Sequence, residues 1–492
     1  MKKKDWLYFL LLAVLFGVFF YFVGEDSPLH DIFYSRDHID RRDTPWFFTC
    51  GKALMNGMVP YVEFADSKGP LLWLIYGLAY LISPHDYFGV WIINGIGYLG
   101  VLLCMYLTVK MFVKKEGVAF LLTLLTVPFL FIPDIHYETK SEDSALIFIA
   151  LSFWQCVRIL YEEKLTDKDW WRAFFLWGLC FGGTLLIKYN SSLMIAVFLA
   201  FMLIRLYQEK RRFWPHFWWA VGGAAAIVLP FVIFLACRGA LWAFIDDYFI
   251  QTPQTIANLK GSRNYFLQMI VDRPDFRALL EMFLIGGAAA WTWLDKWKFF
   301  PLAVTAWFTV MILTFARGYY IIICGPLMVF LPLALYFCIK KHTWPSLVAL
   351  AAIVAIFSVV GYRERNWYTK EYFGTPKTLN ERRKACHAMN DYIASRAHKP
   401  KILYYGCSDK SYGMASEALP ACRYWSQQGG ATKRMNDDQH DCVAQRRADF
   451  VFVKQDAKNN IGRLEKAGYR KVKLPPATKF ILYERGPQSA EQ

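Results

Sequence analysis

Long apolar segments separated by short charged turns occupy the chain up to Gly361. Many of these segments approach the about 20 residues that an α-helix needs to cross a bilayer. We expect eleven spanning helices, at about residues 6–23, 88–109, 117–133, 145–161, 173–187, 191–207, 214–236, 278–294, 299–315, 320–338 and 344–361. The pattern therefore predicts a polytopic α-helical membrane protein.

Two shorter segments near the start follow a different pattern. Residues 43–45, Asp-Thr-Pro, are a typical helix start, and the apolar positions of residues 44–55 fall on one face, which predicts an amphipathic helix in the membrane interface. Residues 70–82 are apolar but too short to cross comfortably, so we expect a second interfacial helix there. If residues 70–82 are not counted as a span, the basic turn 110–115 lies in the cytoplasm, as the positive-inside rule requires.

The amino-terminal Met-Lys-Lys-Lys followed by an apolar run resembles the start of a signal peptide. No small-residue cleavage site follows, and the apolar run is long for a signal peptide, so we expect an uncleaved first helix with its amino terminus in the cytoplasm. Residues 25–69 then form the first outer loop. In this frame each expected inner turn carries Lys or Arg, and the acidic motifs lie outside.

The composition changes after Gly361, which suggests a membrane domain over residues 1–362 and a second domain over residues 363–492. The second part is polar and contains no segment able to span. Its short runs at 401–405, 449–454 and 479–484 have strand character, and a helical pattern around 379–396 precedes them. We therefore expect a small extracytoplasmic α/β domain at the carboxyl terminus.

The composition supports the membrane assignment and argues against nucleic-acid binding. The chain is 56% hydrophobic and 20% charged, below the about 25% charged residues of soluble domains. The formal net charge of +16 does not indicate nucleic-acid binding, because the basic residues sit in short clusters between apolar runs. We expect membrane lipids as neighbours and no nucleic acid as a partner.

The cysteines do not indicate a metal site. The chain has eleven, with no Cys-x-x-Cys pair and no histidine partner at ligand spacing, so a structural zinc ion is not expected. Four of them, Cys386, Cys407, Cys422 and Cys442, lie in the polar carboxyl-terminal part. They form one or two disulfides if that part is extracytoplasmic, or they are four free thiols, and the sequence leaves both alternatives open.

The first outer loop concentrates ionisable side chains next to the membrane. They are Asp40, Arg41, Arg42, Asp43, Lys52, Glu63, Asp66 and Lys68. Asp43 is either the cap of the following helix or a general base. Lys68 either extends towards lipid phosphates in general or neutralises one specific phosphate.

A second outer loop adds acids at a helix start, and two later loops add cations. The second loop contributes Glu138, Lys140, Glu142 and Asp143. Acids at a helix start are often only partners of the helix dipole. Two acidic clusters that face one surface can instead supply a base and an orienting or metal-binding carboxylate. No cofactor is certain, and a divalent metal, if bound, would use Glu142 and Asp143. Lys188 and Arg317 can join Lys68 in a cationic pocket for a phosphate.

These residues form a motif that resembles a known family. The matching positions are Asp43, Phe47, Gly51, Leu54, Gly57, Pro60, Tyr61, Glu63, Phe64, Asp66, Lys68, Gly69, Pro70 and Leu71, with weaker echoes at Glu142, Lys188, Asn190, Arg317, Gly318, Tyr320 and Pro326. The motif resembles the integral-membrane GT-C glycosyltransferases, in the bacterial family-39-like branch related to protein O-mannosyltransferases and to the aminoarabinose transferase of lipid A. The resemblance covers most of the chain. Thr44 stands where many relatives have Glu, and Tyr319 stands where many have His.

The resemblance implies transfer of a sugar from a polyprenyl-phosphate-linked donor at the outer face of a bacterial inner membrane. The acceptor would be a lipid such as lipid A or lipopolysaccharide, a surface glycan or a secreted protein. Asp43 would be the catalytic base. Lys68, Lys188 and Arg317 would bind the donor phosphate. The orienting or supporting residues would be Asp66, Glu142, Asp143 and Tyr320.

Three other functions remain alternatives. A lipid-linked sugar flippase or another transporter would carry ionisable residues within its spans near the membrane midplane, whereas here they gather at one face. A non-catalytic assembly or polymer-binding protein would tolerate the loss of Asp43. Within the transferases, an oligosaccharide polymerase or ligase is a third alternative.

Overall fold

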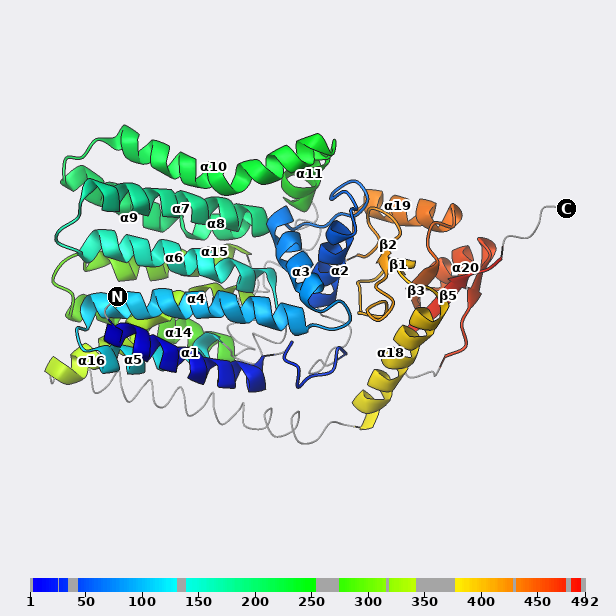
Figure 1. The fold of residues 1–492 in the computed structure, drawn as a ribbon, viewed down its shortest axis with the longest axis horizontal. Coiled ribbons are helices and arrows are strands. Elements are labelled where there is room, and N and C mark those ends of the chain that lie inside the picture. The colour runs from blue at the N-terminus through cyan, green and yellow to red at the C-terminus, as the bar shows by residue number, and fades with distance from the viewer. Residues whose placement is uncertain are drawn as a thin grey trace.

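The computed structural model describes residues 3–24, 26–33, 43–130, 139–253, 274–315, 318–341, 377–427, 431–474 and 479–487. Several predictions lie outside these ranges: the span at 344–361, the domain boundary at 362/363, and the side chains of Asp40, Arg41, Arg42, Glu138 and Arg317. Figure 1 shows a bundle of helices with a small α/β domain beyond one of its ends, and the helices α2 and α3 between the two.

Seven helices or helix pairs of the described chain are long and apolar enough to cross a membrane. They are α1 (Lys3–Val23), α4 (Phe88–Phe112), α6 (Ser141–Tyr161), α7 (Asp167–Ile187), α8 (Tyr189–Met194) with α9 (Ala196–Gln208), α10 (Phe213–Cys237), and the 3₁₀ segment η4 (Gly318–Val329) with α16 (Phe330–Lys341). Each lies where the apolar pattern predicts a span. The protein is a multi-pass membrane protein.

Three further predicted spans form shorter apolar helices. They are α5 (Glu116–Leu124) with η1 (Val127–Leu130), α14 (Pro274–Ala289) with η3 (Ala290–Thr292), and α15 (Phe299–Phe315). All three fall short of the length expected for a straightforward crossing. The total of eleven spans therefore stays a prediction.

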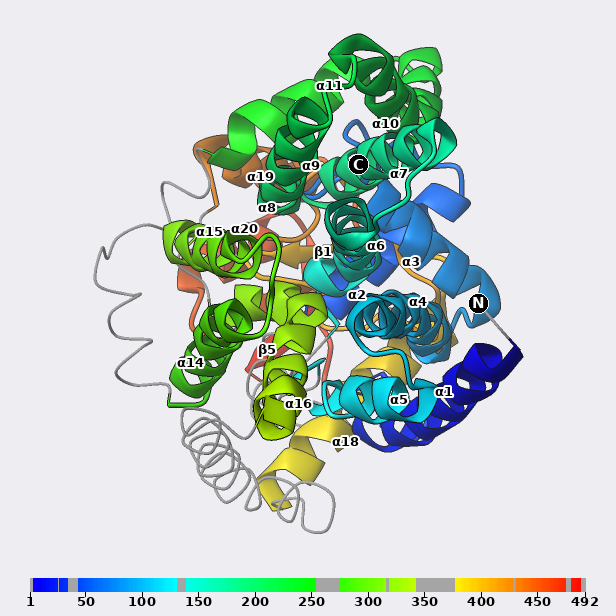
Figure 2. The ribbon, with the colours of Figure 1, turned by 90° about the vertical axis from the view of Figure 1, so that its left-hand side faces the viewer.

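The helices differ in how much of their surface is covered by protein (Figure 2). Only 17% of the most apolar window of α1 and 11% of that of α10 is buried, compared with 83% for Tyr320–Lys340. Apolar side chains on α1 and α10 stay exposed because hydrocarbon rather than protein surrounds them. The segment η4–α16 lies inside the bundle.

Helices α2 (Thr44–Met55) and α3 (Pro70–Ile82) pack on each other at the end of the bundle. They approach closely: a Cβ atom on Gly51 would lie 2.4 Å from the backbone nitrogen of Gly77, so a larger residue does not fit. The prediction of a short helix at 70–82 matches α3.

After α10 the chain continues through α11 (Leu241–Ile245) into the π-helix η2 (Asp246–Gln251).

The prediction for α2 was correct in its bounds and wrong in its environment. An interfacial amphipathic helix keeps one face towards lipid or water, but α2 is buried at every position from Thr44 to Ala53. The carboxyl-terminal domain covers the face opposite α3, and the ring of Trp46 contacts that of Trp425 at 6.3 Å between centroids. Hydrophobic periodicity shows which face is apolar and does not reveal that a segment far along the chain covers the other face.

The carboxyl-terminal domain contains α18 (Lys377–Arg396), α19 (Lys433–Ala444), α20 (Lys458–Lys466) and a five-stranded sheet. Its strands are β1 (Lys401–Tyr405), β2 (Leu419–Pro420), β3 (Phe450–Lys454), β4 (Tyr469–Lys471) and β5 (Phe480–Arg485), in the order β2-β1-β3-β5-β4. Strand β1 is parallel to β2 and β3, whereas β5 is antiparallel to β3 and β4. The predicted strands correspond to β1, β3 and β5, and β2 and β4 were missed because they are only two and three residues long.

Candidate active site

The loop between α2 and α3 is a tightly held turn. We call residues 56–69 the motif loop. Tyr61 adopts φ of 65°, a conformation that costs a non-glycine residue about 1 kcal/mol or more. Its N–H donates to the Phe64 carbonyl at 2.7 Å, its hydroxyl donates to the Lys68 carbonyl at 2.9 Å, and its ring packs 4.5 Å from that of Trp73. Strain of this kind persists only where the surroundings impose it, and it is common at functional sites.

Two backbone hydrogen bonds hold the second half of the motif loop from outside. The Gly69 N–H donates to the Ile187 carbonyl at the end of α7 at 3.0 Å, and the Ala65 N–H donates to the Arg423 carbonyl in the carboxyl-terminal domain at 2.8 Å. A Cβ atom on Gly69 would lie 1.9 Å from the Leu186 oxygen, so only glycine permits this approach. Asp66 and Lys68 therefore lie between two residues, Ala65 and Gly69, whose backbone is held by hydrogen bonds to other parts of the protein.

Asp66 and Lys68 are both buried in this loop, with 8% and 7% of their surface exposed. Asp66 Oδ1 accepts from the Ser67 N–H at 2.6 Å, and Lys68 Nζ donates to Ser67 Oγ at 3.0 Å. Asp66 Oδ2 is 3.9 Å from Lys68 Nζ and has no hydrogen-bond partner in the described part of the chain. Burying a carboxylate oxygen without a hydrogen bond costs free energy. A ligand that donates a hydrogen bond to this atom would recover that free energy.

Asp43 immediately precedes α2. Its carbonyl accepts from the Phe47 N–H at 3.1 Å, but its carboxylate makes no capping hydrogen bond, so the side chain is not a helix cap. Burial raises the pKa of Asp43, the ammonium groups of Lys68 and Lys140 lower it, and the carboxylates of Asp66 and Glu142 raise it. The structure thus gathers four charged groups around Asp43.

The start of α6 forms one wall of this site. The Lys140 N–H donates to Asp143 Oδ2 at 2.6 Å, and the Tyr98 hydroxyl donates to Asp143 Oδ1 at 2.5 Å. The Asp143 side chain therefore caps the Lys140 N–H at the start of α6 and orients Tyr98. The Thr44 hydroxyl donates to the Thr139 carbonyl at 3.2 Å, which joins the start of α2 to the start of α6 and so brings Asp43 next to this wall.

Glu142 and Lys188 form a buried ion pair. Only 1% of Glu142 is exposed, and its carboxylate also accepts from the Ser141 hydroxyl at 2.9 Å. Lys188 Nζ lies 4.5 Å from the centroid of the Tyr320 ring, a cation–π contact, and Asn190 Nδ2 donates to the Tyr320 hydroxyl at 3.4 Å. Residues from α6, the α7–α8 junction and η4 thus meet, as the sequence predicts, but Lys188 already has an acidic partner.

A metal site is not evident in the described ranges. They contain no group of three or more His, Cys, Asp or Glu side chains suited to hold an ion. Glu142 turns to Lys188 whereas Asp143 turns to Tyr98, so the two adjacent acids do not converge on one point. Cys386, Cys407, Cys422 and Cys442 are buried. The two alternatives that the sequence leaves open for them, disulfides or free thiols, remain predictions.

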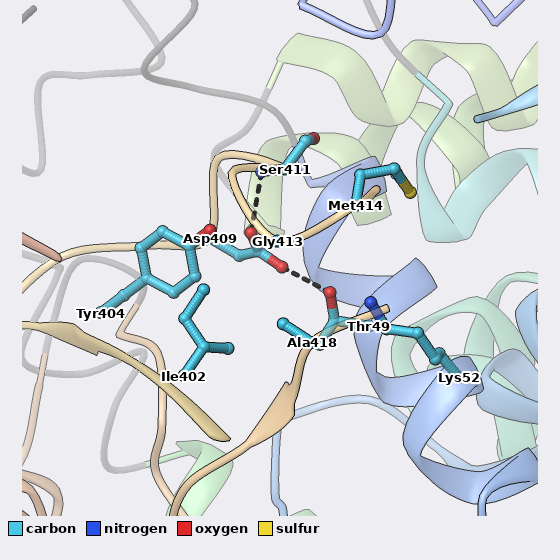
Figure 3. Close-up of a pocket in the computed structure, with 9 residues that line it drawn as sticks. All are labelled: Thr49, Lys52, Ile402, Tyr404, Asp409, Ser411, Gly413, Met414 and Ala418. Atoms are coloured by element: carbon cyan, nitrogen blue, oxygen red, sulfur yellow. Dashed lines mark hydrogen bonds between the residues drawn. The ribbon is translucent and has the colours of Figure 1, made fainter. Parts of the chain in front are cut away.

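A narrow pocket separates α2 from the carboxyl-terminal domain on the far side of the helix (Figure 3). It encloses about 220 Å³ between atoms, part of it open to solvent, and its interior has room for about one water molecule. The Thr49 hydroxyl donates to Asp409 Oδ2 at 2.6 Å, and Asp409 Oδ1 accepts from the Ser411 N–H at 2.8 Å. These bonds fasten α2 to the domain.

Lys52 lines the same pocket and is 1% exposed. Among the described residues its ammonium group makes no hydrogen bond or ion pair. Burial lowers its pKa to about 8, because the attraction of Asp409 and Glu417 compensates only part of the lost hydration. The pocket therefore contains an incompletely compensated charge, in contrast to the ion-paired Lys188.

The sequence assigned no role to several residues that shape the site. Lys140 was noted at the helix start but was given no part in the site. Asp247, Asp409 and Arg423 had no local signal, because Asp409 bonds Thr49 of α2 across 360 residues and Asp247 pairs with Arg423 across 176 residues.

With this geometry in view, the comparisons with known proteins become informative. Residues 33–243 match the family model of dolichyl-phosphate-mannose-protein mannosyltransferase. The matched segment contains the motif loop together with Asp43, Glu142 and Lys188. Over residues 33–243, less than half of the chain, the sequence is similar to this glycosyltransferase family.

Two solved structures are similar to this chain in fold. The crystal structure of ArnT from Cupriavidus metallidurans bound to undecaprenyl phosphate superimposes with a TM-score of 0.62, at 12% identity over 100% of both chains. The apo form of the same protein gives a TM-score of 0.56, at 12% identity over 97% of this chain and 99% of that one. Among curated proteins, no sequence matches the chain.

Proposed function

We propose that this protein is a GT-C glycosyltransferase that moves a sugar from a polyprenyl-phosphate-linked donor to a hydroxyl of a cell-envelope acceptor, with inversion at the anomeric carbon. The observation that carries the proposal is the arrangement around Asp43: its carboxylate makes no capping hydrogen bond, and the ammonium groups of Lys68 and Lys140 are close enough to lower its pKa. A base beside cations is what a reaction needs when it takes a proton from one oxygen and leaves negative charge on another.

Asp43 is the proposed general base. Its carboxylate takes the proton of the acceptor hydroxyl while that oxygen attacks the anomeric carbon from the side opposite the phosphate. A new carbon–oxygen bond forms as the bond to the phosphate oxygen breaks, so one substitution gives inversion. The raised pKa of Asp43 makes its carboxylate a stronger base than an ordinary aspartate.

Lys68 is the proposed partner of the leaving phosphate. Its ammonium group has been removed from water, and its fixed position needs no reorganisation as charge develops on the phosphate oxygen. Lys188 and Arg317 complete the proposed phosphate site. Because Lys188 is paired with Glu142, the phosphate would share or replace that partner. The ArnT structure, which was solved with undecaprenyl phosphate, supports a lipid-linked phosphate as the donor group.

The remaining residues are proposed to hold the acceptor and the site walls. Asp66 Oδ2 lacks a hydrogen bond among the described residues and can accept one from a sugar hydroxyl. Glu142 and Tyr320 fix Lys188, and Asp143 fixes Tyr98. We place catalysis in residues 1–362 and give residues 363–492 a supporting role.

We further propose that the reaction takes place at the outer face of a bacterial inner membrane. Helices α2 and α3, which are joined by the motif loop, lie at the end of the bundle that carries the carboxyl-terminal domain (Figure 1). The positive-inside rule places that end outside. Lipid A or lipopolysaccharide, a surface glycan and a secreted protein are the acceptor classes that such a site can reach.

The experiment uses full-length protein in liposomes, a panel of polyprenyl-phosphate sugars, and acceptors from the three classes. The wild type should consume one donor and form a glycoside of inverted configuration. Asp43→Asn should bind the donor and fail to turn it over, with kcat lower by about 10²- to 10⁴-fold. Glu63→Gln is the matched control, because Glu63 is an exposed acid of the same loop whose carboxylate contacts only the Val59 N–H among the described residues.

Equal turnover by the wild type and Asp43→Asn would move the base elsewhere, with Glu142 as the next candidate. Movement of donor across the bilayer without consumption would favour a flippase. Repeated addition to one growing glycan would identify a polymerase.

A further inference from the structure

Two ion pairs connect η2 to the carboxyl-terminal domain, and they differ in burial. Arg423 Nη2 and Nε lie 2.8 and 3.2 Å from Asp247 Oδ2, and the exposed fractions of the two side chains are 20% and 4%. Arg434 pairs with Asp246, and these side chains are 42% and 20% exposed. The first pair is mostly enclosed by protein, and the second is about twice or more as exposed to solvent.

The buried Arg423–Asp247 pair also has hydrogen-bond partners for both oxygens of its carboxylate. Asp247 Oδ1 accepts from the Tyr424 hydroxyl at 2.7 Å, so both oxygens of this carboxylate are used by adjacent residues of the carboxyl-terminal domain. Removing one partner from such a pair leaves an uncompensated buried charge, which is strongly destabilising locally. The segment that contains Arg423 and Tyr424 is therefore held firmly against η2.

Arg423 has a second contact that Arg434 lacks. Its carbonyl accepts the Ala65 N–H at 2.8 Å, one residue before Asp66. The side chain thus fixes Arg423 on η2 while its backbone fixes the motif loop. One residue of the carboxyl-terminal domain therefore sets where the loop that bears Lys68 lies.

The contacts of η2 and of the motif loop also reach the chain next to Lys188, the second lysine proposed to bind the donor phosphate. Tyr248, which follows Asp247, donates its hydroxyl hydrogen to the Leu185 carbonyl at 2.6 Å, and Gly69 bonds the Ile187 carbonyl. Lys188 follows Ile187 directly. Through η2, the position of Arg423 is linked to the loop of Lys68 and to the helix end that carries Lys188.

We propose that Arg423 is a positioning residue of the donor-phosphate site, which it shapes through Asp247 and Ala65 without touching the substrate. The carboxyl-terminal domain is then part of the active-site framework as well as a cover over α2. This inference rests on the proposed function, because it assigns Lys68 and Lys188 to the donor phosphate. Small displacements of binding groups can cost about 10²-fold in rate, so a loosened loop should be measurable.

The test measures binding of undecaprenyl phosphate and single-turnover transfer by the full chain in liposomes. We compare the wild type with Arg423→Met, Arg423→Lys, Asp247→Asn and the matched control Arg434→Met. Arg423→Met and Asp247→Asn should weaken lipid-phosphate binding and slow transfer, each by about tenfold or more. Arg423→Lys should restore part of both, since it keeps the charge but loses the two-nitrogen contact. Arg434→Met should behave as the wild type.

The controls separate this inference from a purely structural role and from the proposed function. If Arg423→Met does not fold, Arg423→Lys and Asp247→Asn carry the test. A lower melting temperature with unchanged binding and transfer in the folded variants would overturn the positioning role, and so would equal losses in Arg434→Met. If the wild type itself binds no polyprenyl phosphate, the proposed donor is wrong. If it binds and all variants match it, only the role of Arg423 is wrong.

Discussion

Lys52 and Lys68 are two buried lysines from one short stretch, and their surroundings differ. Lys68 lies in the motif loop beside Asp66, with its nitrogen 3.0 Å from the Ser67 hydroxyl and 3.9 Å from the carboxylate. Lys52 faces the other side of α2, towards the carboxyl-terminal domain, with Asp409 and Glu417 as its charged neighbours and no direct contact to either. The first lysine belongs to a gathered set of charges around Asp43, and the second lies in a domain interface.

The difference shows how buried charges can serve separate purposes within one helix–loop unit. A cation held beside a carboxylate with an unused oxygen is arranged for a ligand. A cation whose hydration is only partly replaced affects how strongly two parts of the protein adhere, and makes that adhesion depend on pH. Burial alone does not distinguish them, because both residues are more than nine-tenths buried.

The largest expected difference is in catalysis. Lys68→Met should lower transfer by about 10²-fold or more and weaken lipid-phosphate binding, because it removes a fixed charge from the leaving group. Lys52→Met removes a similar side chain from the other face of α2 and should retain most transfer activity. Both are compared by single-turnover transfer in liposomes. Similar losses in both variants would mean that the two lysines do not have separate functions.

The pH dependence of transfer should follow Asp43. The pKa of Asp43 is raised above its ordinary value by burial, and the base acts only when ionised, so the rate should fall with decreasing pH below a midpoint higher than that of a free aspartate. The fall should approach tenfold per pH unit. A profile of kcat against pH from 4 to 8 tests this, and a flat profile over that range would contradict it.

The raised pKa of Asp43 also has a consequence for stability. The folded state binds this proton more tightly than the unfolded state does, so the stabilisation is present at low pH and is lost as pH rises through the folded-state pKa. At neutral pH the ionised carboxylate is therefore a cost. Asp43→Asn should melt at the same temperature as the wild type or higher, even though it is inactive. This melting measurement distinguishes a lost base from a misfolded protein.

Lys52 should make stability rise with pH on the alkaline side. Its pKa is about 8 in the folded protein and about 10.4 in an unfolded chain, so the unfolded state binds more protons between these values. Stability from this group should increase by about 3 kcal/mol across that window. Melting temperatures of the wild type and Lys52→Met between pH 7 and 10 isolate the contribution. Parallel pH curves for the two proteins would show that Lys52 is not the titrating group.

The smallest expected effect concerns the Thr49–Asp409 hydrogen bond beside Lys52. Thr49→Val removes the 2.6 Å hydrogen bond to Asp409 with little change in shape, and should lower stability by about 1 kcal/mol. Transfer activity should be unchanged, because Thr49 lies on the pocket side of α2. Thermal melting and single-turnover transfer of the same preparation test both statements. A large loss of transfer would connect the pocket to the active site.

The sequence predicted the membrane helices and three of the five strands, since both depend on local periodicity. It also predicted that Glu142, Lys188 and Tyr320 share one site, and the structure brings these three together. The environment of α2 was wrong, because a segment near Trp425 covers a face that the pattern assigned to the interface. The contact of Arg423 with Ala65 could not be read from residue patterns, because a backbone hydrogen bond leaves no mark on residue type.

The chain by itself determined where apolar segments alternate with charged turns and which acids and lysines are available for chemistry. Those features follow from hydrophobicity and backbone geometry over a few neighbouring residues. Only the tertiary structure decided which lysine lies beside Asp66 near Asp43 and which faces the carboxyl-terminal domain. That choice depends on desolvation and on charges brought from hundreds of residues away, and these are properties of the packed molecule.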